Sequence, residues 1–311
     1  MKHAVVIGDP AYFRIKAGKN PYTRTRWGFK KKVDLTAAIA QWQNFKLALE
    51  KLGVRVFVLP ASRENPSMVF PANAGFLFPK YEPLAWTEKR FYVSRLSPHR
   101  KAEAVVYTEF FSGLGFSVDT LPYDFEGEAD FFPCDDFYIF SYGKIVPTGF
   151  RPVVGWLPYR YQFSHRSDRR NKETLQKIVG NREIIEVYLT DERYYHGDTV
   201  MFALGVRREY LLAYRAAMDS ASWDRLKRHL GSHLIELSRE DAENFAANSF
   251  QADTPLGPHI IFPSGISGDL KEKVSSLGFS FTLVDVSEFF KKGGGSVKCM
   301  LCDLGPLPIQ K

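Results

Sequence analysis

The feature that most constrains this chain is a pattern that occurs five times. A stretch with helical spacing of apolar residues ends at a glycine and leads directly into a β-rich run. In the first copy, apolar residues recur at helical spacing over 36–52, Gly53 ends the helix, and 54–59 has the composition of a strand. The glycines of the five copies, separated by about 45 to 65 residues, are Gly53, Gly115, Gly180, Gly231 and Gly278. Such repetition predicts an α/β fold whose units form a closed ring.

The organisation of the chain favours a single domain. No Gly/Ser-rich linker and no change of composition divides residues 1–311. The stretch 142–163 is rich in Pro, Gly and aromatic residues, and we predict that it is a surface insertion. A helix followed by glycine and a strand is also ordinary punctuation of α/β proteins, so the pattern alone leaves the ring a hypothesis.

Length and composition predict a soluble globular protein. With 311 residues, of which 45% are hydrophobic, the chain can bury a packed core. It contains no charged leader followed by an apolar run and no 18 consecutive apolar residues, so we expect neither secretion nor contact with a membrane. Three cysteines are an odd number in a long chain, which favours free thiols in a reducing compartment, the cytoplasm.

The net charge of +7 raises the question of nucleic-acid binding. Basic residues gather at 30–32 and at 166–170. Acidic residues are interspersed throughout, however, and neither zinc-finger spacing nor an RNA-recognition motif accompanies the charge, so we predict no nucleic-acid partner. Some arginines remain available to bind a substrate carboxylate.

A candidate nucleophile lies near the end of the chain. Cys299 follows the glycine-rich turn 293–295, whose glycines permit close approach of the backbone to a ligand. A cysteine in this position can also be a small buried apolar residue. Cys302 completes a Cys-x-x-Cys spacing, but no second ligand pair supports zinc, and a thioredoxin-type site belongs at a helix start after the first strand. We therefore predict no metal and no thioredoxin-type site, and the role of Cys302 stays open.

Two polar runs complete the candidate chemistry. His196 follows a predicted strand over 184–189 and a polar turn, where catalytic groups are commonly presented, although a surface-loop histidine fits the same pattern. Alternation over 125–130 would place Glu126, Glu128 and Asp130 on one face of a strand, bordered by phenylalanines. Buried carboxylates need a cation, and a cationic organic substrate suits them better than a metal.

These motifs, in their order along almost the whole chain, resemble the guanidino-group-modifying superfamily. That superfamily includes arginine deiminases, dimethylarginine hydrolases, amidinotransferases and arginine dihydrolases. The resemblance implies a five-bladed α/β propeller, the pentein fold, which would account for the five repeats. The runs that carry it are NPY at 20–22, NPSMVF at 65–70, ANAG at 72–75, FEGEAD at 125–130, RSD at 166–168, YYHGDT at 194–199, NFA at 244–246 with Asn248, and GGGSVKCM at 293–300.

The resemblance also implies roles for four residues. Cys299 corresponds to the nucleophile and His196 to the general acid and base. Glu126 and Asp198 correspond to carboxylates that hold the guanidinium group, although the spacing leaves open whether Glu126 or Glu128 makes the contact. The chemistry of this superfamily needs neither a metal nor an organic cofactor.

Four further residues are implied to bind the substrate. Arg100 and Arg166 resemble residues that bind its carboxylate. Asn73 stands where deiminases usually carry Asp, and together with Asn20 it resembles the arginine dihydrolase branch, which converts arginine to ornithine, ammonia and carbon dioxide. The partner predicted for this chain is therefore a small guanidino molecule, and a homo-oligomer is compatible with the sequence.

Several alternatives stay open at this point. The sequence cannot distinguish a hydrolase from an amidinotransferase, or a dihydrolase from a single-step deiminase or dimethylarginine hydrolase. Ala129 stands where the superfamily usually has Gly, and Gly197 where it usually has Leu. A non-catalytic binding protein on the same fold is an alternative of another class, against which the presence of Cys299, His196 and Glu126 together argues.

Overall fold

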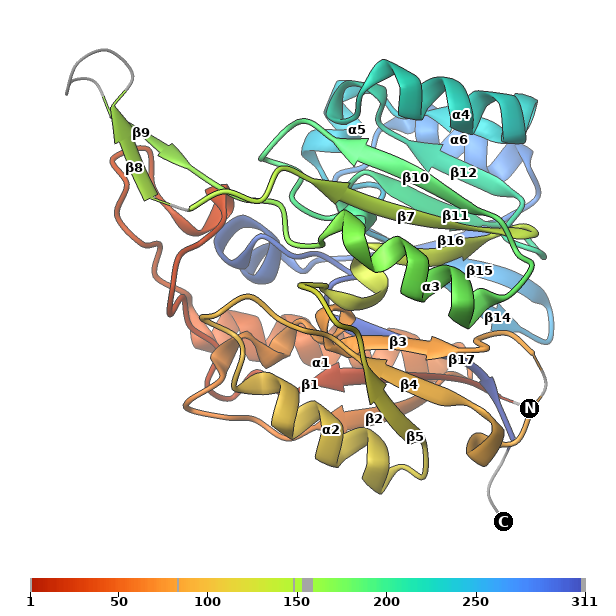
Figure 1. Ribbon diagram of the computed structural model, residues 1–311, viewed down its shortest axis with the longest axis horizontal. Coiled ribbons are helices and arrows are strands. Elements are labelled where there is room, and N and C mark those ends of the chain that lie inside the picture. The colour runs from red at the N-terminus through yellow and green to blue at the C-terminus, as the bar shows by residue number, and fades with distance from the viewer. Residues whose placement is uncertain (1, 83, 148, 153–158, 309–311) are drawn as a thin grey trace.

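Strands and helices alternate along the computed structural model, which describes residues 2–82, 84–147, 149–152 and 159–308 (Figure 1). The α-helices of this part of the chain are α1 (Leu35–Lys51), α2 (Glu103–Gly113), α3 (Lys172–Val179), α4 (Ser220–Leu230), α5 (Arg239–Glu243) and α6 (Gly268–Ser276). Its strands are β1 (Lys2–Gly8), β2 (Arg55–Leu59), β3 (Gly75–Phe78), β4 (Arg90–Val93), β5 (Ser117–Thr120), β6 (Phe131–Cys134), β7 (Phe137–Gly143), β8 (Gly149–Pro152), β9 (Tyr159–Gln162), β10 (Ile184–Leu189), β11 (Met201–Leu204), β12 (Tyr210–Ala213), β13 (Leu234–Glu236), β14 (Phe250–Thr254), β15 (Gly257–Pro263), β16 (Ser280–Val284) and β17 (Leu301–Leu307).

Five three-stranded sheets share one connectivity. In each sheet a first strand pairs antiparallel with a second, a helix follows, and a third strand pairs parallel with the second. The five units are β3-β4-β5 with α2, β6-β7-β10 with α3, β11-β12-β13 with α4, β14-β15-β16 with α6, and β17-β1-β2 with α1. The structure therefore confirms the predicted α/β fold of five repeated units.

The ring closes through the two ends of the chain. Strand β1 pairs antiparallel with β17, from Lys2 opposite Leu307 to Ile7 opposite Leu301. First strands of different units also contact each other, β17 with β3 and β6 with β11. The sheet that joins β17 to β1 and β2 thus completes the fivefold propeller.

The five predicted glycines end the helices as expected. Their φ angles lie between 53° and 95°, a left-handed conformation that glycine adopts at little cost. In all five, nothing lies within 4 Å of the position that a Cβ atom would occupy. The backbone conformation, and not crowding, is therefore what requires glycine at these helix ends.

Helix α1 shows how the sequence places such a unit. The side chain of Asp34 accepts a hydrogen bond from the backbone N–H of Ala37 at 3.1 Å and thereby caps the helix start. Phe45 and Leu49, both on the predicted apolar face, are completely buried, and Trp42 packs against the same cluster. Each fully buried side chain of this kind contributes roughly 1.5–3 kcal/mol, so burial of this face holds the helix against the sheet.

Part of the predicted insertion 142–163, namely residues 148 and 153–158, lies outside the described residues. Its described part contains the end of β7 and the hairpin of β8 and β9, which projects from the body of the molecule (Figure 1). We propose that residues 1–311 form one domain, with this hairpin as an addition between the second strand and the helix of one unit.

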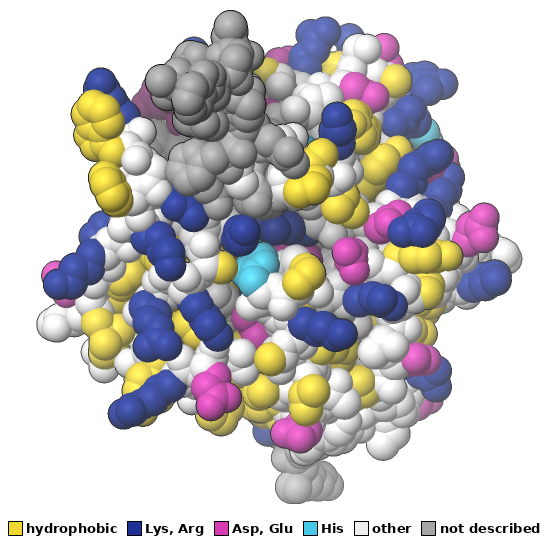
Figure 2. All heavy atoms as spheres, turned by 60° about the vertical axis from the view of Figure 1, so that its left-hand side comes forward, with side chains coloured by type: hydrophobic (Ala, Val, Ile, Leu, Met, Phe, Trp, Pro, Cys, Tyr) yellow, Lys and Arg dark blue, Asp and Glu magenta, His cyan; other side chains and the backbone are white. Residues whose placement is uncertain are grey.

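Two further features bear on the predicted partners. None of the described helices combines the length and the apolar character needed to cross a bilayer, and the described His, Cys, Asp and Glu side chains form no group of three that could hold a metal ion. Figure 2 shows one face of the molecule, on which Lys and Arg side chains are interspersed with acidic and hydrophobic ones.

Candidate active site

The turns that lead into the first strands of the sheets carry the polar residues of the candidate site. Asn73 lies in the short helical turn before β3, and Glu126 begins the one before β6. Asp198 lies in the turn before β11, and Cys299 lies two residues before β17. The turn before β6 contacts both the turn before β3 and the turn before β11, and β17 contacts the turn before β3. The fivefold arrangement therefore brings side chains from distant parts of the sequence to one centre.

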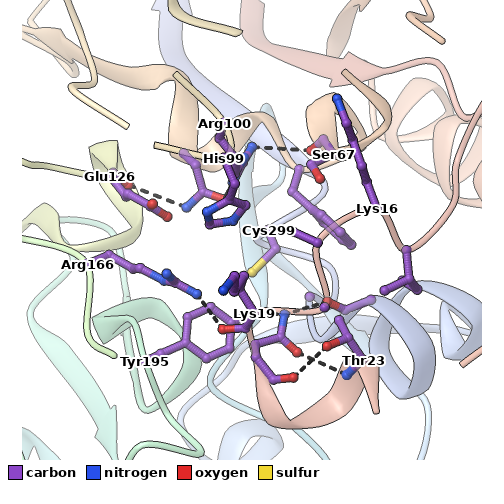
Figure 3. Close-up of a pocket in the computed structure, with 18 of the residues that line it drawn as sticks. Lys16, Lys19, Thr23, Ser67, His99, Arg100, Glu126, Arg166, Tyr195 and Cys299 are labelled. Carbon is purple, nitrogen blue, oxygen red and sulfur yellow. Dashed lines mark hydrogen bonds between the residues drawn. The ribbon is translucent and has the colours of Figure 1, made fainter. Parts of the chain in front are cut away.

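A cavity that is open to solvent lies at this centre (Figure 3). Its lining includes seven of the eight predicted site residues, namely Cys299, His196, Glu126, Asn20, Asn73, Arg100 and Arg166. The eighth, Asp198, does not line this cavity and borders a second one, but its Oδ2 atom lies 3.6 Å from the Cys299 sulfur. All eight residues are thus gathered around one site.

The turn that carries Cys299 is held by Asn248, which is completely buried. The Oδ1 atom of Asn248 accepts hydrogen bonds from the backbone N–H groups of Ser296 at 3.0 Å and Cys299 at 3.1 Å. Its Nδ2 atom donates to the Cys299 sulfur at 3.2 Å and to the carbonyl oxygen of Asp198 at 3.0 Å. One side-chain amide therefore fixes both the backbone and the thiol of the candidate nucleophile.

The glycine-rich turn before Cys299 makes room for protein side chains as well as for the cavity. A Cβ atom at Gly294, whose φ is 84°, would lie 2.7 Å from Oδ1 of Asn20. At Gly293 and Gly295 it would lie 2.7 and 2.6 Å from the ring of Phe70. Asn20 in turn donates to the carbonyl oxygen of Gly293 at 2.9 Å. The close approach predicted to serve a ligand is therefore used, at residue 294, by Asn20.

Cys299 and Asp198 are both buried, and their anionic forms repel each other. Burial raises the pKa of the Cys299 thiol well above its usual value, and the neighbouring Asp198 carboxylate raises it further. Burial likewise raises the pKa of Asp198 to about 6. Near neutral pH the thiol is therefore protonated beside an ionised carboxylate, and a bound cation would favour ionisation of both groups.

His196 and Glu126 form a buried ion pair, with 2.9 Å between Nε2 and Oε2. The other carboxylate oxygen of Glu126 accepts a hydrogen bond from Ser97 at 2.9 Å. Burial disfavours the imidazolium, but the carboxylates of Asp130, Glu126 and Asp198 outweigh it and raise the pKa of His196. Burial alone would raise the pKa of Glu126, but the hydrogen bond and the positive charge of His196 outweigh burial and lower it. His196 is thus set up to be a proton donor.

The prediction that Glu126, Glu128 and Asp130 share one face of a strand is wrong, because residues 127–129 form a helical turn of about three residues. The three side chains therefore point to different partners. Glu128 forms buried ion pairs with Lys80 and Lys298, while Asp130 accepts hydrogen bonds from two serine hydroxyls and a backbone N–H. Glu126 alone of the three lines the cavity, so it is the one placed to meet a substrate.

The two predicted carboxylate-binding arginines differ in what already binds them. Arg100 donates three hydrogen bonds to the Glu103 carboxylate at 2.7–3.1 Å and one to Oδ1 of Asn73 at 2.7 Å. Arg166 donates to a backbone carbonyl at 2.7 Å, and within the described residues no carboxylate forms an ion pair with it. The geometry therefore favours Arg166 as the group that is free to bind a substrate anion, and Arg100 as the group that orients Asn73.

Sequence reasoning did not assign Asn248 or Tyr195 to the site. The hydroxyl of Tyr195 donates to the carbonyl oxygen of Gly294 at 2.8 Å and accepts from Asn20 at 3.3 Å, so it ties the site's loops together. Asn248 could have been found from the repeat, because it precedes β14 by two residues as Cys299 precedes β17. Tyr195 carries no comparable signal apart from its place next to His196.

The bonds of Asn248 predict a stability effect. Asn248→Ala would leave the buried N–H groups of Ser296 and Cys299 without acceptors, so we expect the free energy of unfolding to fall by about 2–4 kcal/mol. Urea unfolding measures this change. Asn181→Ala, an exposed position, is the matched control and should change stability by less than about 0.5 kcal/mol. Equal stability of the two variants would contradict the clamp.

Comparisons with known proteins agree with this arrangement. The model of the family described as N,N dimethylarginine dimethylhydrolase, eukaryotic, matches residues 160–305. The N(G),N(G)-dimethylarginine dimethylaminohydrolase of Mycobacterium tuberculosis is 26% identical over 298 residues, which cover 96% of this chain and 84% of that protein. The bifunctional arginine dihydrolase/ornithine cyclodeaminase AgrE of Nostoc sp. is 30% identical over 266 residues, 85% of this chain but only 33% of that protein.

A solved structure matches the chain over its whole length. The N-terminal domain of ArgZ, an arginine dihydrolase from the ornithine-ammonia cycle in cyanobacteria, was solved bound to product; it is 26% identical, with a TM-score of 0.80 over 99% of this chain and 100% of that chain. A variant of the same domain, covalently bound to a reaction intermediate, gives 25% identity and a TM-score of 0.79, over 98% of this chain and 100% of that one.

Fold and site together define a class of protein, a five-bladed α/β propeller with a cysteine, a histidine and carboxylates at its centre. This is the pentein fold. In sequence and fold the chain is similar to dimethylarginine dimethylaminohydrolases and arginine dihydrolases, in line with the resemblance that its sequence motifs carry.

Proposed function

We propose that this protein is a cysteine-dependent C–N hydrolase that acts on a guanidino substrate, arginine or a derivative of it. One observation carries the proposal: a single cavity joins Cys299 to the ion pair of His196 and Glu126, and Asp198 lies 3.6 Å from the sulfur. A guanidinium group offers an electron-poor planar carbon to a sulfur nucleophile and a positive charge to the two carboxylates. The site supplies one group for each of these needs.

In the first step a bond forms between the Cys299 sulfur and the guanidinium carbon. The bound cation stabilises the thiolate, and the thiol proton passes to the adjacent carboxylate of Asp198. The imidazolium of His196 then donates its proton to a terminal nitrogen, the C–N bond breaks, and ammonia leaves with the Asp198 proton as ammonium. This step leaves a cationic S-alkylthiouronium on Cys299 and a neutral His196.

In the second step water replaces the sulfur. Neutral His196 takes a proton from water, the hydroxide adds to the thiouronium carbon, and the C–S bond breaks as the thiol is restored. The product is a urea of the citrulline type. A second round releases another ammonia and leaves a carbamic acid, which loses carbon dioxide, so that one guanidinium ion and two waters give one alkylammonium ion, two ammonia and one carbon dioxide.

The second round is what makes a dihydrolase, and Asn73 favours it. An Asp at this place can only accept hydrogen bonds, which suits a guanidinium ion but not the oxygen of a neutral urea. The amide of Asn73 also offers N–H donors, which can hold the urea oxygen for a second attack. AgrE and ArgZ, both described as arginine dihydrolases, support the same branch.

Amidinotransferase, single-step deiminase and dimethylarginine hydrolase are the rival activities within the superfamily, and they differ in what reaches the intermediate and when the product leaves. Incubation with arginine, with and without glycine as an amine acceptor, separates them. A dihydrolase gives ornithine and two ammonia for each arginine consumed. Citrulline alone indicates single-step deimination, and an amidinated glycine indicates transfer. If the protein leaves every guanidino compound unchanged and Cys299 unmodified, it is a binding protein and the proposal fails.

We also propose that the enzyme works in the cytoplasm. The three cysteines, Cys134, Cys299 and Cys302, are all free and buried. Free thiols persist in a reducing compartment, and the proposed reaction depends on one of them.

A further inference from the structure

The mouth of the active-site cavity carries an excess of positive charge. Arg14, Lys16, Lys19 and Arg166 all line it, and Figure 3 shows Lys19 and Arg166 near Cys299, while the Lys16 side chain points away from the sulfur. Arg14 donates to the backbone carbonyl of residue 63, Lys16 to that of residue 64, and Arg166 to that of residue 19, at 2.6–2.9 Å. Neutral carbonyls therefore hold these three side chains in place without compensating their charge.

No acidic side chain at the mouth balances these cations. Glu126 is the one carboxylate among the described lining residues, and it is bound to His196 and Ser97. No carboxylate of the described chain forms an ion pair with any of the four cations named above. The carboxylates of Glu126 and the adjacent Asp198 therefore lie near the nucleophile, and the uncompensated cations lie elsewhere around the cavity.

His99 also lines the mouth, where its side chain is partly exposed. Partial desolvation of the ring, together with the positive charges of Arg166, Arg100 and Lys19, outweighs the effect of Glu126 and lowers the pKa of His99 to about 4. Its imidazole is therefore neutral at physiological pH. A substrate tail that enters here meets cations and a neutral ring but no anion.

Free arginine does not match this entrance well. Its tail carries one carboxylate and one ammonium, so the charges of the tail sum to zero and the ammonium faces repulsion from the rim cations. A tail with a carboxylate but no free ammonium matches the rim and still presents the guanidinium to Cys299. Electrostatic complementarity of this kind selects among substrates and suppresses those with charges of the wrong sign.

We propose, on the basis of the hydrolase function above, that the preferred substrate is a guanidino acid with a net negative tail, in which the α-amino group is absent or acylated. Lys16, Lys19 and Arg166 are the residues that determine this specificity. A tail that lacks the α-amino group and a tail whose α-amino group is acylated both carry a net negative charge. The experiment distinguishes these two kinds of substrate.

The test compares kcat/KM for 4-guanidinobutyrate, N-acetylarginine, arginine and n-butylguanidine at low ionic strength. We expect 4-guanidinobutyrate or N-acetylarginine to exceed arginine at least about tenfold, and the advantage to shrink as salt is added. A larger value for 4-guanidinobutyrate identifies a tail without the amino group, and a larger value for N-acetylarginine an acylated one. If arginine equals or exceeds both, the inference is overturned while the hydrolase function stands.

Variants test the residues themselves. Lys16→Gln combined with Lys19→Gln should lower kcat/KM for the two anionic-tailed compounds about tenfold and change the value for n-butylguanidine less than about twofold. Lys177→Gln, an exposed position on α3, is the matched control and should change neither. An unchanged preference in the double variant would contradict the role of the rim.

Binding measured by calorimetry separates this inference from the proposed reaction. In Cys299→Ser, 4-guanidinobutyrate or N-acetylarginine should bind at least about tenfold more tightly than arginine, whether or not the native protein turns them over. Tighter binding without turnover supports the tail preference and refutes the hydrolase. Equal or weaker binding of both compounds overturns the tail preference.

Discussion

Replacing Cys299 by serine is expected to abolish turnover of guanidino substrates while leaving the fold intact. A serine hydroxyl ionises far less readily than a thiol, and no other cysteine among the described residues lines the cavity. We expect kcat to fall by roughly 10⁴-fold or more. The new side chain has nearly the same shape and can still accept from Asn248, so the free energy of unfolding should change by about 1 kcal/mol or less. Ammonia release and urea unfolding measure the two effects.

Cys302→Ala is the matched control for this loss. Cys302 lies in β17, where it is completely buried in an apolar cluster, and burial raises the pKa of its thiol well above the usual value. We expect this variant to keep the kcat of the native protein. Substantial turnover by Cys299→Ser, or an intermediate trapped on another residue in mass spectra, would contradict the assignment of the nucleophile.

Asp198→Asn is expected to make the protein more stable and nearly inactive. The carboxylate contacts the Cys299 thiol and, in the proposed reaction, helps to neutralise the substrate, so its loss should lower kcat by roughly 10²–10³-fold. In the native protein, burial raises the pKa of Asp198 from 3.8 to about 6, which means that the folded state holds this proton more tightly than the unfolded chain. Binding of this proton therefore stabilises the folded state fully below about pH 4, and this stabilisation is lost as pH rises through about 6.

An asparagine cannot ionise, so the Asp198→Asn variant does not lose stability in this way as pH rises. At pH 8 the free energy of unfolding of Asp198→Asn should therefore exceed that of the native protein by up to about 3 kcal/mol, and the gap should close toward pH 4. Activity of the native protein should rise through about pH 6 as Asp198 ionises. Denaturant unfolding between pH 4 and pH 8 tests the first point, with Asp224→Asn, an exposed position on α4, as control. A gap independent of pH would rule out ionisation of Asp198 as its cause.

Much of the fold could be predicted because its signals are local. An amphipathic helix that ends at a glycine, as α1 does before Gly53, identifies itself within some 20 residues, and this signal recurs in every unit. The pairing of β1 with β17 could not be predicted in the same way. It joins residues from opposite ends of the chain, and its register depends on the ring as a whole.

The residues of the site likewise divide into those that a local sequence pattern reveals and those that depend on contacts between distant parts of the chain. Cys299, His196 and Asn73 lie in motifs that can be recognised in the sequence, whereas the error over 125–130 arose because alternation looks the same in a strand and in a turn. Gly127, with a φ of 70°, breaks the strand there, and a Cβ atom at this position would lie 2.6 Å from the carbonyl oxygen of Ala72. That contact comes from another unit of the propeller, so no local pattern contains it.

The pairing of β1 with β17 also decides when the enzyme can acquire activity during its synthesis. Residues 301–307 emerge from the ribosome after the other strands of the five sheets, and the turn with Cys299 immediately precedes them. A nascent chain therefore carries its histidine and carboxylates long before it has a nucleophile held in place. If Cys299 is the nucleophile, as proposed, we expect catalysis to begin only once β17 has docked beside β1.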